Sequence, residues 1–341
     1  MVRKNEPACR QDKPRVAVII AARNEADNLP ALLDDLARQT YPQDKLEIWV
    51  ADDRSTDETW QVITQYMKKM PNLQGIRIRQ PNPAMTGKKN ALTQCIRKIR
   101  APLILQTDAD CRVGPEWVES MALSLTPETG IVVGYSGRMM GGGVLAKYEA
   151  LDYLALNAAN YGMLLNGKSW SGSGTNLAYQ RTAFTDIRGY EPVAQRIGDD
   201  DMYLVQNIPR LAQYSVRVNL SPKAWVKSRT DTSLTGFLNQ RIRWASNARG
   251  LEKIDRLFWF FLLSAFVSNL ALLVGGLLFM PMVATWALVK FIAEFLVTTL
   301  AAVRFKESRL IPLIPVWFIL QPVYVPYVTA MGLLGRFKWK V

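Results

Sequence analysis

The stretch RVAVIIAARNE spans residues 15–25, and after one helical pattern it is followed by LEIWVADDRSTD at residues 46–57. Each stretch begins with a short apolar run and ends in polar and acidic residues. This pattern is typical of a buried parallel strand that leads into a loop. Because open α/β sheets bind ligands beyond the carboxyl ends of their strands, we expect an α/β fold with a binding site at that edge.

The same alternation of apolar runs with helical patterns continues to about residue 220. It favours βαβ units around a largely parallel sheet, and therefore a soluble α/β domain. The expected strands are residues 15–22, 46–51, 75–79, 102–106 and 131–135, and the helices expected between the first four are 26–38, 58–69 and 88–99.

The composition changes near residue 257. Residues 257–289 contain no charged side chain, and the apolar character continues to residue 303 with only Lys290 and Glu294 interrupting it. This length predicts two membrane spans joined near residue 280. Because Lys290 and Glu294 are four residues apart, we expect them to form an intramembrane pair or to meet a polar acceptor group.

A third apolar segment, residues 310–334, contains four prolines, which favour a kinked span or a re-entrant segment over a straight helix. Basic residues flank the first two spans and close the chain, so the positive-inside rule places the α/β domain and the chain end in the cytoplasm. A third full span would violate this rule, which favours a re-entrant or interfacial last segment. The first residues do not resemble a signal peptide. The expected organisation is an N-terminal tail at 1–14, an α/β domain at 15–230, an interfacial segment at 231–256, a membrane region at 257–335 and a basic tail at 336–341.

Composition excludes several kinds of catalysis. The chain has no histidine, so it cannot contain a Ser-His-Asp triad, a histidine base or a histidine-ligated zinc site. Its three cysteines have no metal-ligand spacing. The net charge of +13 fits anionic lipid, phosphorylated ligands or nucleic acid. Hydropathy favours lipid, and no nucleic-acid-binding module is recognisable.

Carboxylates follow two of the expected strands. Adjacent Asp52 and Asp53 repel each other and require a cation or hydrogen-bond donors such as a base or ribose, although helix capping explains part of this loop. Asp108 and Asp110, one residue apart after the fourth strand, can approach one Mg²⁺ or Mn²⁺ that bridges to a diphosphate. Lys88, with Lys89, begins a helix and either adds positive charge beside a phosphate or forms a solvated helix end.

A third acidic cluster, Asp199 to Asp201, lies far along the chain. It can supply a base that deprotonates an acceptor hydroxyl, because clustered like charges raise the pKa of one member. A solvent-exposed acidic turn is the alternative interpretation.

Taken together, these residues resemble the family 2 inverting glycosyltransferases with a GT-A fold, a group that includes cellulose, chitin and hyaluronan synthases. The resemblance covers residues 15–244. It implies that Glu25, Asp52 and Asp53 hold the nucleoside of the donor, and that Asp108 and Asp110 form the metal-binding D-x-D motif. Donor binding by Lys88 is predicted from its place at the start of a helix. The segment 174–179 is similar to the family's G-x-N-x-A-Y segment.

The sequence Gln240-Arg241-Ile242-Arg243-Trp244 fits the Q-x-x-R-W signature of the membrane-associated members. The resemblance implies that Gln240, Arg243 and Trp244 contact the donor diphosphate and frame the acceptor entrance. Members usually have Glu-Asp at the catalytic base, where this chain has Asp199 and Asp200. We align Asp200 with the base, and a shift in register would move the role to Asp199 or Asp201.

The implied reaction transfers a sugar, with inversion, from a nucleotide-sugar to a hydroxyl group of a membrane-borne lipid acceptor. A UDP-sugar fits the family habit and a GDP-sugar is not excluded. The protein is then an integral membrane enzyme, with a bacterial inner membrane as the expected location, an oligomeric state left open and no nucleic-acid partner. The alternatives are an oligomeric polysaccharide synthase and a membrane scaffold that binds nucleotide without turnover.

Overall fold

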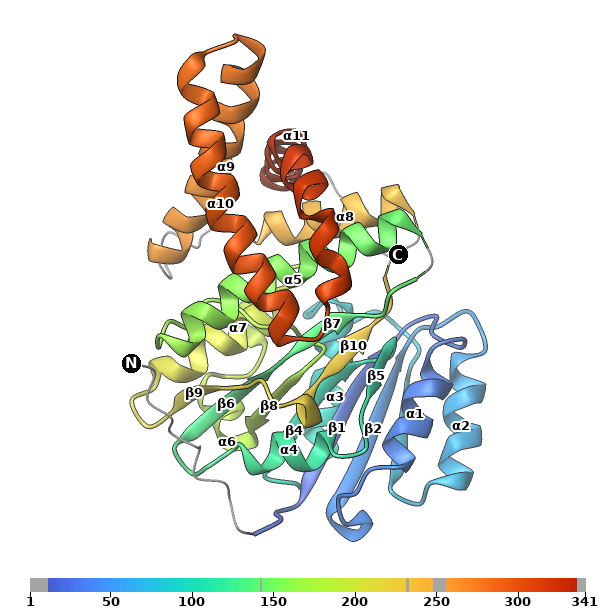
Figure 1. The fold of residues 1–341 in the computed structure, drawn as a ribbon. Helices are drawn as coiled ribbons and strands as arrows, with labels where there is room; N and C mark the ends of the chain where they lie inside the picture. Colours follow the sequence, from blue (N-terminus) through green and yellow to red (C-terminus); the bar gives the residue numbers. More distant parts are fainter. Residues whose placement is uncertain (1–11, 142, 231–232, 248–255, 336–341) are drawn as a thin grey trace. The chain divides into compact units, whose positions relative to one another are not determined.

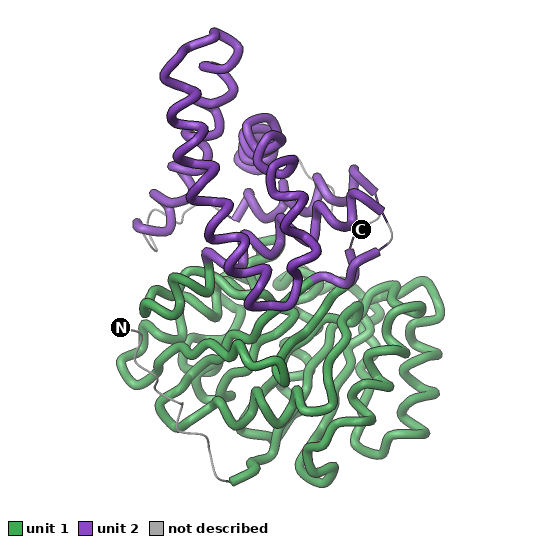
Figure 2. The backbone as a smooth tube through the Cα atoms, in the orientation of Figure 1, with its two compact units in different colours: residues 1–137, 160–228 green, residues 138–159, 229–341 purple. Residues whose placement is uncertain are grey.

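The computed structural model describes residues 12–141, 143–230, 233–247 and 256–335. The chain forms two compact units, which are shown in different colours in Figure 2. Unit 1 comprises residues 1–137 and 160–228, and unit 2 comprises residues 138–159 and 229–341. Both units are therefore assembled from separate parts of the chain.

Unit 1 contains a seven-stranded sheet with helices packed around it (Figure 1). The strand order is β3-β2-β1-β4-β8-β6-β9, with β3, β2, β1 and β4 parallel and β8 antiparallel to both of its neighbours. The strands are β1 Val16–Ala22, β2 Leu46–Asp53, β3 Leu73–Ile78, β4 Leu103–Asp108, β6 Thr129–Gly134, β8 Leu177–Gln180 and β9 Ser215–Asn219. A small sheet has the order β5-β10-β7, formed by Cys111–Val113, Val226–Ser228 and Ser136–Arg138.

The helices of unit 1 follow the strands in βαβ fashion. They are α1 Leu29–Ala37, α2 Thr59–Lys69, α3 Gly87–Lys98, α4 Trp117–Leu123, α6 Arg181–Asp186 and α7 Asp200–Asn207. Short 3₁₀ turns lie at Gln43–Lys45, Glu191–Val193, Ile208–Arg210 and Pro222–Ala224. All five expected strands and all three expected helices are present, with ends within three residues of the expected positions. The largely parallel α/β sheet is confirmed, whereas the short strands β8 and β9 were not expected.

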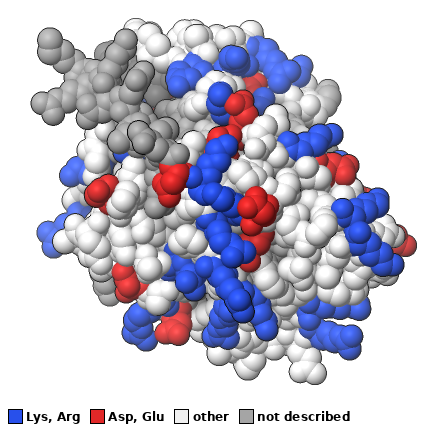
Figure 3. Space-filling view, turned by 90° about the horizontal axis from the view of Figure 1, so that it is seen from below, with Lys and Arg blue, Asp and Glu red and all other residues white. Residues whose placement is uncertain are grey.

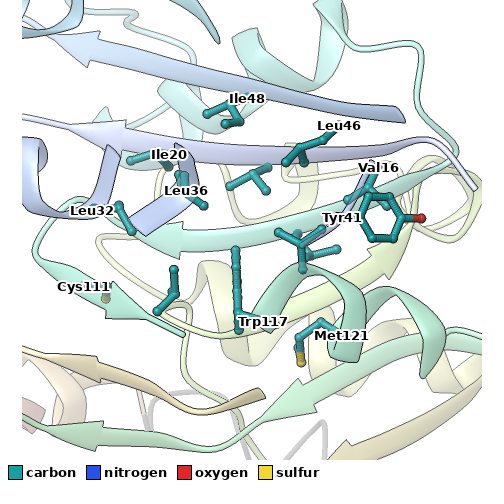
Figure 4. Packing of buried hydrophobic residues seen from close by; sticks show 14 of the residues in the cluster. Val16, Ile20, Leu32, Leu36, Tyr41, Leu46, Ile48, Cys111, Trp117 and Met121 are labelled. Carbon is teal, nitrogen blue, oxygen red and sulfur yellow. The ribbon is translucent and has the colours of Figure 1, made fainter. Parts of the chain in front are cut away.

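The core of unit 1 lies between β1, β2 and the helices α1 and α4 (Figure 4). Trp117 is completely buried, and its Nε1 donates to Oδ1 of Asn176 at 3.0 Å. The Asn176 side-chain nitrogen in turn donates to the backbone oxygens of Tyr135 and Ala224, both at 2.8 Å. The asparagine of the segment 174–179 therefore has a structural role, because it joins the start of β8 to the backbone at Tyr135 and at the 3₁₀ turn Pro222–Ala224.

Unit 2 consists of long helices. They are the greater part of α5 Val144–Leu165, then α8 Leu234–Ser246, α9 Arg256–Leu277, α10 Pro281–Arg304 and α11 Ile314–Leu334, the last preceded by a 3₁₀ turn at Ser308–Leu313. Three helices are long and apolar enough to cross a membrane: Arg256–Leu277, Pro281–Arg304 and Ser308–Leu334. The two expected spans, joined near residue 280, correspond to α9 and α10.

The third apolar segment is not a re-entrant hairpin, and whether it spans the membrane or lies at the interface stays a prediction. It forms one helix that continues through Pro322 and Pro326. A re-entrant hairpin would require a turn inside the segment, and no turn interrupts residues 314–334. Prolines are tolerated in such a helix where neighbouring groups satisfy the freed backbone oxygens.

A polar cluster joins two of these apolar helices. Lys290 and Glu294 of α10 form the expected ion pair, with Nζ 2.6 Å from Oε1. Gln321 of α11 completes a ring, because it accepts from Lys290 at 3.1 Å and donates to Glu294 at 2.8 Å. The charges inside this apolar region are therefore paired, as polar groups between such helices usually are.

The positive charge of the chain is not confined to residues that flank the apolar helices. Seen from below, Lys and Arg side chains gather in an irregular band with Asp and Glu beside parts of it (Figure 3). Exposed Arg97 and Lys98, for example, lie in the last turn of α3.

Candidate active site

The carboxyl ends of three parallel strands bring the first predicted carboxylates to one edge of the sheet. Asp52 is in register with Ala22, and Asp108 is in register with Ala21, so β2 and β4 place one aspartate on each side of the end of β1. This arrangement follows from the parallel pairing of strands that all end in polar residues.

The loops after β1 and β2 are joined to each other. Asn24 has a left-handed backbone with φ 54°. Its Oδ1 accepts from the Thr56 amide at 2.8 Å, and its own amide donates to Ser55 Oγ at 3.0 Å. The Glu25 amide donates to Thr59 Oγ1 at 2.8 Å, and its carboxylate accepts from Asn28 at 2.6 Å. The Asn-Glu pair thus holds the two loops in place, and contact of Glu25 with a nucleoside stays a prediction.

The adjacent carboxylates Asp52 and Asp53 are both buried, and the chain itself supplies their partners. Asp52 Oδ1 accepts from the Ser55 amide at 3.1 Å, and its Oδ2 lies 3.8 Å from Arg77 Nε. Asp53 pairs with Arg54, whose Nε is 2.9 Å from Oδ1. Hydrogen-bond donors and cations from the chain itself therefore stabilise both carboxylates, and their binding of the nucleoside stays a prediction.

The centre of the site is the Lys88 ammonium group. Its Nζ lies 2.8 Å from Asp108 Oδ1 and 3.2 Å from Asp200 Oδ2. Burial alone would lower the pKa of Lys88, but the two carboxylates outweigh burial and raise it, so the ammonium stays charged. A Cβ at Gly174 would lie 3.1 Å from Nζ and 3.3 Å from Asp200 Oδ2, so only glycine fits at this position without moving its neighbours. Three of the predicted residues therefore meet at one point.

Asp200 has a second partner that the sequence did not identify. Gln106 of β4 is fully buried, and its Nε2 donates to Asp200 Oδ2 at 3.3 Å. The hydroxyls of Tyr179 and Tyr190 both donate to Gln106 Oε1, at 3.3 and 3.1 Å. An uncharged glutamine in a strand pattern gives no sequence signal for such a role.

The three carboxylates of the acidic cluster face different partners. Asp199, with φ 63°, lies 3.3 Å from Arg196 Nη1. Asp201 accepts from the amides of Gly174 and Met202, both at 2.8 Å. Only Asp200 faces Lys88, which favours Asp200 over its neighbours for the role of base.

The pKa shifts in this cluster differ from the sequence expectation. Burial would raise the pKa of Asp200, but the ammonium groups of Lys88 and Lys89 outweigh burial and lower it. Burial and then the charge of Asp200 raise the pKa of Asp201 to about 6. The pKa therefore rises for Asp199, through burial, and for Asp201, whereas the charges of the two lysines lower the pKa of Asp200.

The predicted metal ligands are only partly assembled. Asp108 is bound to the Lys88 ammonium, and Asp110 Oδ1 lies 3.6 Å from the Sγ of Cys111. Among the described residues no group of three or more acidic, cysteine or histidine side chains forms a metal site. The two carboxylates that converge on the Lys88 ammonium are Asp108 and Asp200, so a metal site formed by Asp108 and Asp110 stays a prediction.

The Q-x-x-R-W segment lies on α8 in unit 2. Gln240 Oε1 accepts from Arg138 Nη2 at 3.2 Å, and the Trp244 ring lies 4.2 Å from the Arg241 guanidinium. Arg241, at a variable position of the motif, is buried, and its Nε donates to Asp152 Oδ2 of α5 at 2.7 Å. The buried arginine of this segment is therefore Arg241, which sequence alone cannot distinguish from the half-buried Arg243.

The profile of glycosyl transferase family 21 matches residues 3–340. The chain belongs to glycosyl transferase family 21. The family model that matches the chain is therefore family 21 and not family 2, which the motifs resemble. The coarser prediction, a glycosyltransferase family with a GT-A-like fold, is confirmed.

Relatives of this family 21 chain are distant. The probable glycosyltransferase YdaM of Bacillus subtilis is 23% identical over 259 residues, which are 71% of this chain and 58% of that protein. The beta-monoglucosyldiacylglycerol synthase of Synechocystis is 31% identical over 100 residues, which are 29% of this chain and 20% of that protein. The matches thus span less than two thirds of the length of either relative.

Solved structures establish the fold of this family 21 chain. The mannosyltransferase PcManGT from Pyrobaculum calidifontis, in complex with GDP-Man and Mn²⁺, aligns with a TM-score of 0.62 and 20% identity, covering 96% of this chain and 90% of that one. Residues 1–349 of TarS from S. aureus align with a TM-score of 0.50 and 18% identity, covering 95% and 93%. At these identities the likeness concerns the fold alone, and it agrees with the α/β sheet described above.

Proposed function

We propose that this family 21 protein transfers a sugar from a nucleotide-sugar, of the UDP class, to a hydroxyl group of a membrane lipid, with inversion of configuration. The observation that carries the proposal is the convergence of Asp108 and Asp200 on Lys88 at the carboxyl edge of the sheet. A diphosphate donor requires a positive charge, and the attack on its sugar requires a general base. The Lys88 ammonium and the Asp200 carboxylate place these two groups together.

In the proposed reaction Asp200 is the base. Its carboxylate accepts the proton of the acceptor hydroxyl as the hydroxyl oxygen bonds to the anomeric carbon. The bond from that carbon to the diphosphate oxygen breaks, and its electron pair leaves with the nucleoside diphosphate. Attack from the face opposite the leaving group inverts the configuration.

The remaining residues are proposed to bind the donor. Asp108 and Asp110 would hold Mg²⁺ or Mn²⁺, which neutralises diphosphate charge when bound. Lys88 would add a second positive charge beside the phosphates, while Glu25, Asp52 and Asp53 would hold the nucleoside. The contact of Gln240, Arg243 and Trp244 with the donor diphosphate and the acceptor entrance stays a prediction. Support for a metal comes from the solved mannosyltransferase, which binds Mn²⁺.

The lipid acceptor is supported by two observations. Three helices of this chain have the length and composition of membrane spans, and the Synechocystis relative is named beta-monoglucosyldiacylglycerol synthase. We further propose a cytoplasmic catalytic unit, on the distribution of basic residues around the spans.

The test uses the full chain in nanodiscs that contain diacylglycerol, with Mg²⁺ or Mn²⁺ and radiolabelled UDP-glucose, UDP-galactose or GDP-mannose. We expect label in the organic phase, and we expect Asp200→Asn to lower kcat by about 10²–10⁴-fold because the base is lost. Glu191→Gln is the matched control, since Glu191 is an exposed carboxylate that pairs with the nearby exposed Arg188. Label in polymer would support the polysaccharide synthase instead, and neither hydrolysis nor transfer with any donor would overturn an enzymatic function.

A further inference from the structure

Lys89, the neighbour of Lys88 in the first turn of α3, is buried to 2% exposure. Its Nζ donates to the backbone oxygens of both Arg196 and Gly198. A lysine is rarely buried without a compensating partner, because removing an ammonium group from water is unfavourable. Of the two interpretations left open for Lys88 and Lys89, the solvated helix end is therefore wrong for Lys89, which points into the protein.

The segment that receives Lys89 has an unfavourable backbone. Gly198 has φ 86° and Asp199 has φ 63°, so two successive residues are left-handed immediately before α7 begins at Asp200. The left-handed region is disfavoured for residues with a Cβ, and Asp199 therefore needs support from its surroundings. The carbonyl of Gly198, directly before Asp199, is one of the two that Lys89 binds.

Uncharged groups at the start of α3 contact the same segment. The Thr86 amide donates to Ala194 O at 2.9 Å, and Thr86 Oγ1 donates to Arg196 O at 3.0 Å. Gln195 Nε2 donates to Pro83 O at 2.9 Å. These contacts involve residues 194–196 and carry no charge. Lys89 adds a positive charge and binds Gly198, which is nearer to Asp200 in the sequence.

The charge of Lys89 acts on the acidic cluster that follows. Burial lowers the pKa of Lys89, and the carboxylates of Asp200, Asp199 and Asp201 oppose this change. The groups that face Asp200 are Lys88 and Lys89 from α3, Gln106 from β4 with its two tyrosines, Gly174 from its loop, and Asp199 and Asp201 from its own turn.

We propose that Lys89 is a positioning residue, which fixes the turn at residues 196–199 through two carbonyl groups and so holds the Asp200 carboxylate between Lys88 and Gln106. The proposal rests on the proposed function of Asp200 as the base. The two neighbouring lysines thus have different roles. The Lys88 ammonium pairs with Asp200, and the Lys89 ammonium binds the backbone just before Asp200.

The kinetic test uses Lys89→Met in the full chain, since methionine has similar length and no charge. We expect kcat to fall by up to about 10²-fold, the loss that a displacement of about 1 Å produces, with KM for the donor nearly unchanged. The acidic limb of the kcat profile should move to higher pH, because Asp200 loses one of the two positive charges that lower its pKa. Lys89→Arg should recover part of the loss.

Thr86→Val is the matched control, because it removes an uncharged hydrogen bond to the same Arg196 carbonyl. It should leave the pH profile in place. Unchanged kcat in Lys89→Met, or a loss of kcat with an unmoved pH profile that Thr86→Val reproduces, would overturn the proposal.

A second measurement does not depend on activity. Backbone hydrogen exchange in residues 194–203 should become faster in Lys89→Met, while exchange in β1 and β2 stays the same. Unchanged exchange in residues 194–203 would show that Lys89 does not fix the turn. If the wild-type protein transfers no sugar, the proposed function fails on that result, and the exchange experiment still decides whether Lys89 holds the turn.

Discussion

Gln106 has one orientation that satisfies its surroundings. Two tyrosine hydroxyls donate to its Oε1, so its Nε2 is left to donate to Asp200 and, at 3.5 Å, to the Gly174 carbonyl. The amide orientation thus follows from the hydrogen-bond network. A neutral side chain in the middle of a strand thereby helps to define where the base lies.

Gln106→Glu tests this arrangement at the scale of one residue. A second carboxylate oxygen would replace the donor that lies 3.3 Å from Asp200 Oδ2. Two carboxylates at such a distance cannot both ionise easily, so the pKa of Asp200 should rise and the acidic limb of the kcat profile should move up by about 1–2 pH units.

Tyr190→Phe is the control for that substitution, because it removes one of the two donors to Oε1 and adds no charge. It should change the profile by much less. An acidic limb that stays in place in Gln106→Glu would show that Asp200 is not the group that titrates.

Single residues also show what the sequence can reveal. Asp52, Asp108 and Asp200 could be located because carboxylates at strand ends and in clusters are conspicuous. Lys89 and Gln106 could not, because their roles depend on contacts with residues about 110 and 94 positions away. Arg241 and Arg243 have the same side chain, and only burial distinguishes them.

At the scale of elements, the apolar helices were easier to predict than their packing. The lengths of α9 and α10 follow from an apolar run that only Lys290 and Glu294 interrupt, whereas α11 continues through two prolines that sequence reasoning treats as breaks. Gly332 allows α11 to pack closely against α8. A Cβ at this position would lie 2.7 Å from Ala245 Cβ and 2.8 Å from Ile242 O, both of α8.

Gly332→Ala should therefore destabilise unit 2. Backbone cannot give way as a side chain can, so α8 and α11 must move apart, and we expect a loss of about 1–3 kcal/mol in the free energy of unfolding. Thermal unfolding in nanodiscs would measure it.

The same change at Gly276 of α9 provides the control. A Cβ at Gly276 meets nothing within 4 Å, so Gly276→Ala should be neutral or stabilising by up to about 1 kcal/mol through helix propensity. Equal effects of the two substitutions would contradict the close contact of α11 with α8.

At the scale of the whole molecule, the chain crosses between its units more than once. Residues 138–159 belong to unit 2 although they precede the last strands of unit 1. Asp152 of α5 accepts from Arg241, from Trp317 Nε1 at 3.0 Å and from the Tyr324 hydroxyl at 3.3 Å. Composition gives no sign of this grouping, because the partners of α5 lie far along the chain.

A fragment of residues 1–228 should therefore fail to give a soluble, folded α/β domain. The fragment would retain α5 and lose every described donor to the Asp152 carboxylate, together with the helices α8 and α11 that supply those donors. Size-exclusion chromatography and thermal unfolding, with the full chain in detergent for comparison, would check this. A monodisperse fragment that melts cooperatively would contradict it.

The sequence separation of Asp152 from its partners also determines when these contacts can form during translation. Asp152 leaves the ribosome 89 residues ahead of Arg241, and 165 and 172 residues ahead of Trp317 and Tyr324. At roughly 5–20 residues per second, the wait for Arg241 alone lasts about 4–18 s. Throughout that interval Arg241 has not been synthesised and cannot pair with Asp152. The last two partners of Asp152 emerge only with α11, after α9 and α10 have left the ribosome. The final closure of unit 2 is therefore a late event that must await nearly the whole of translation.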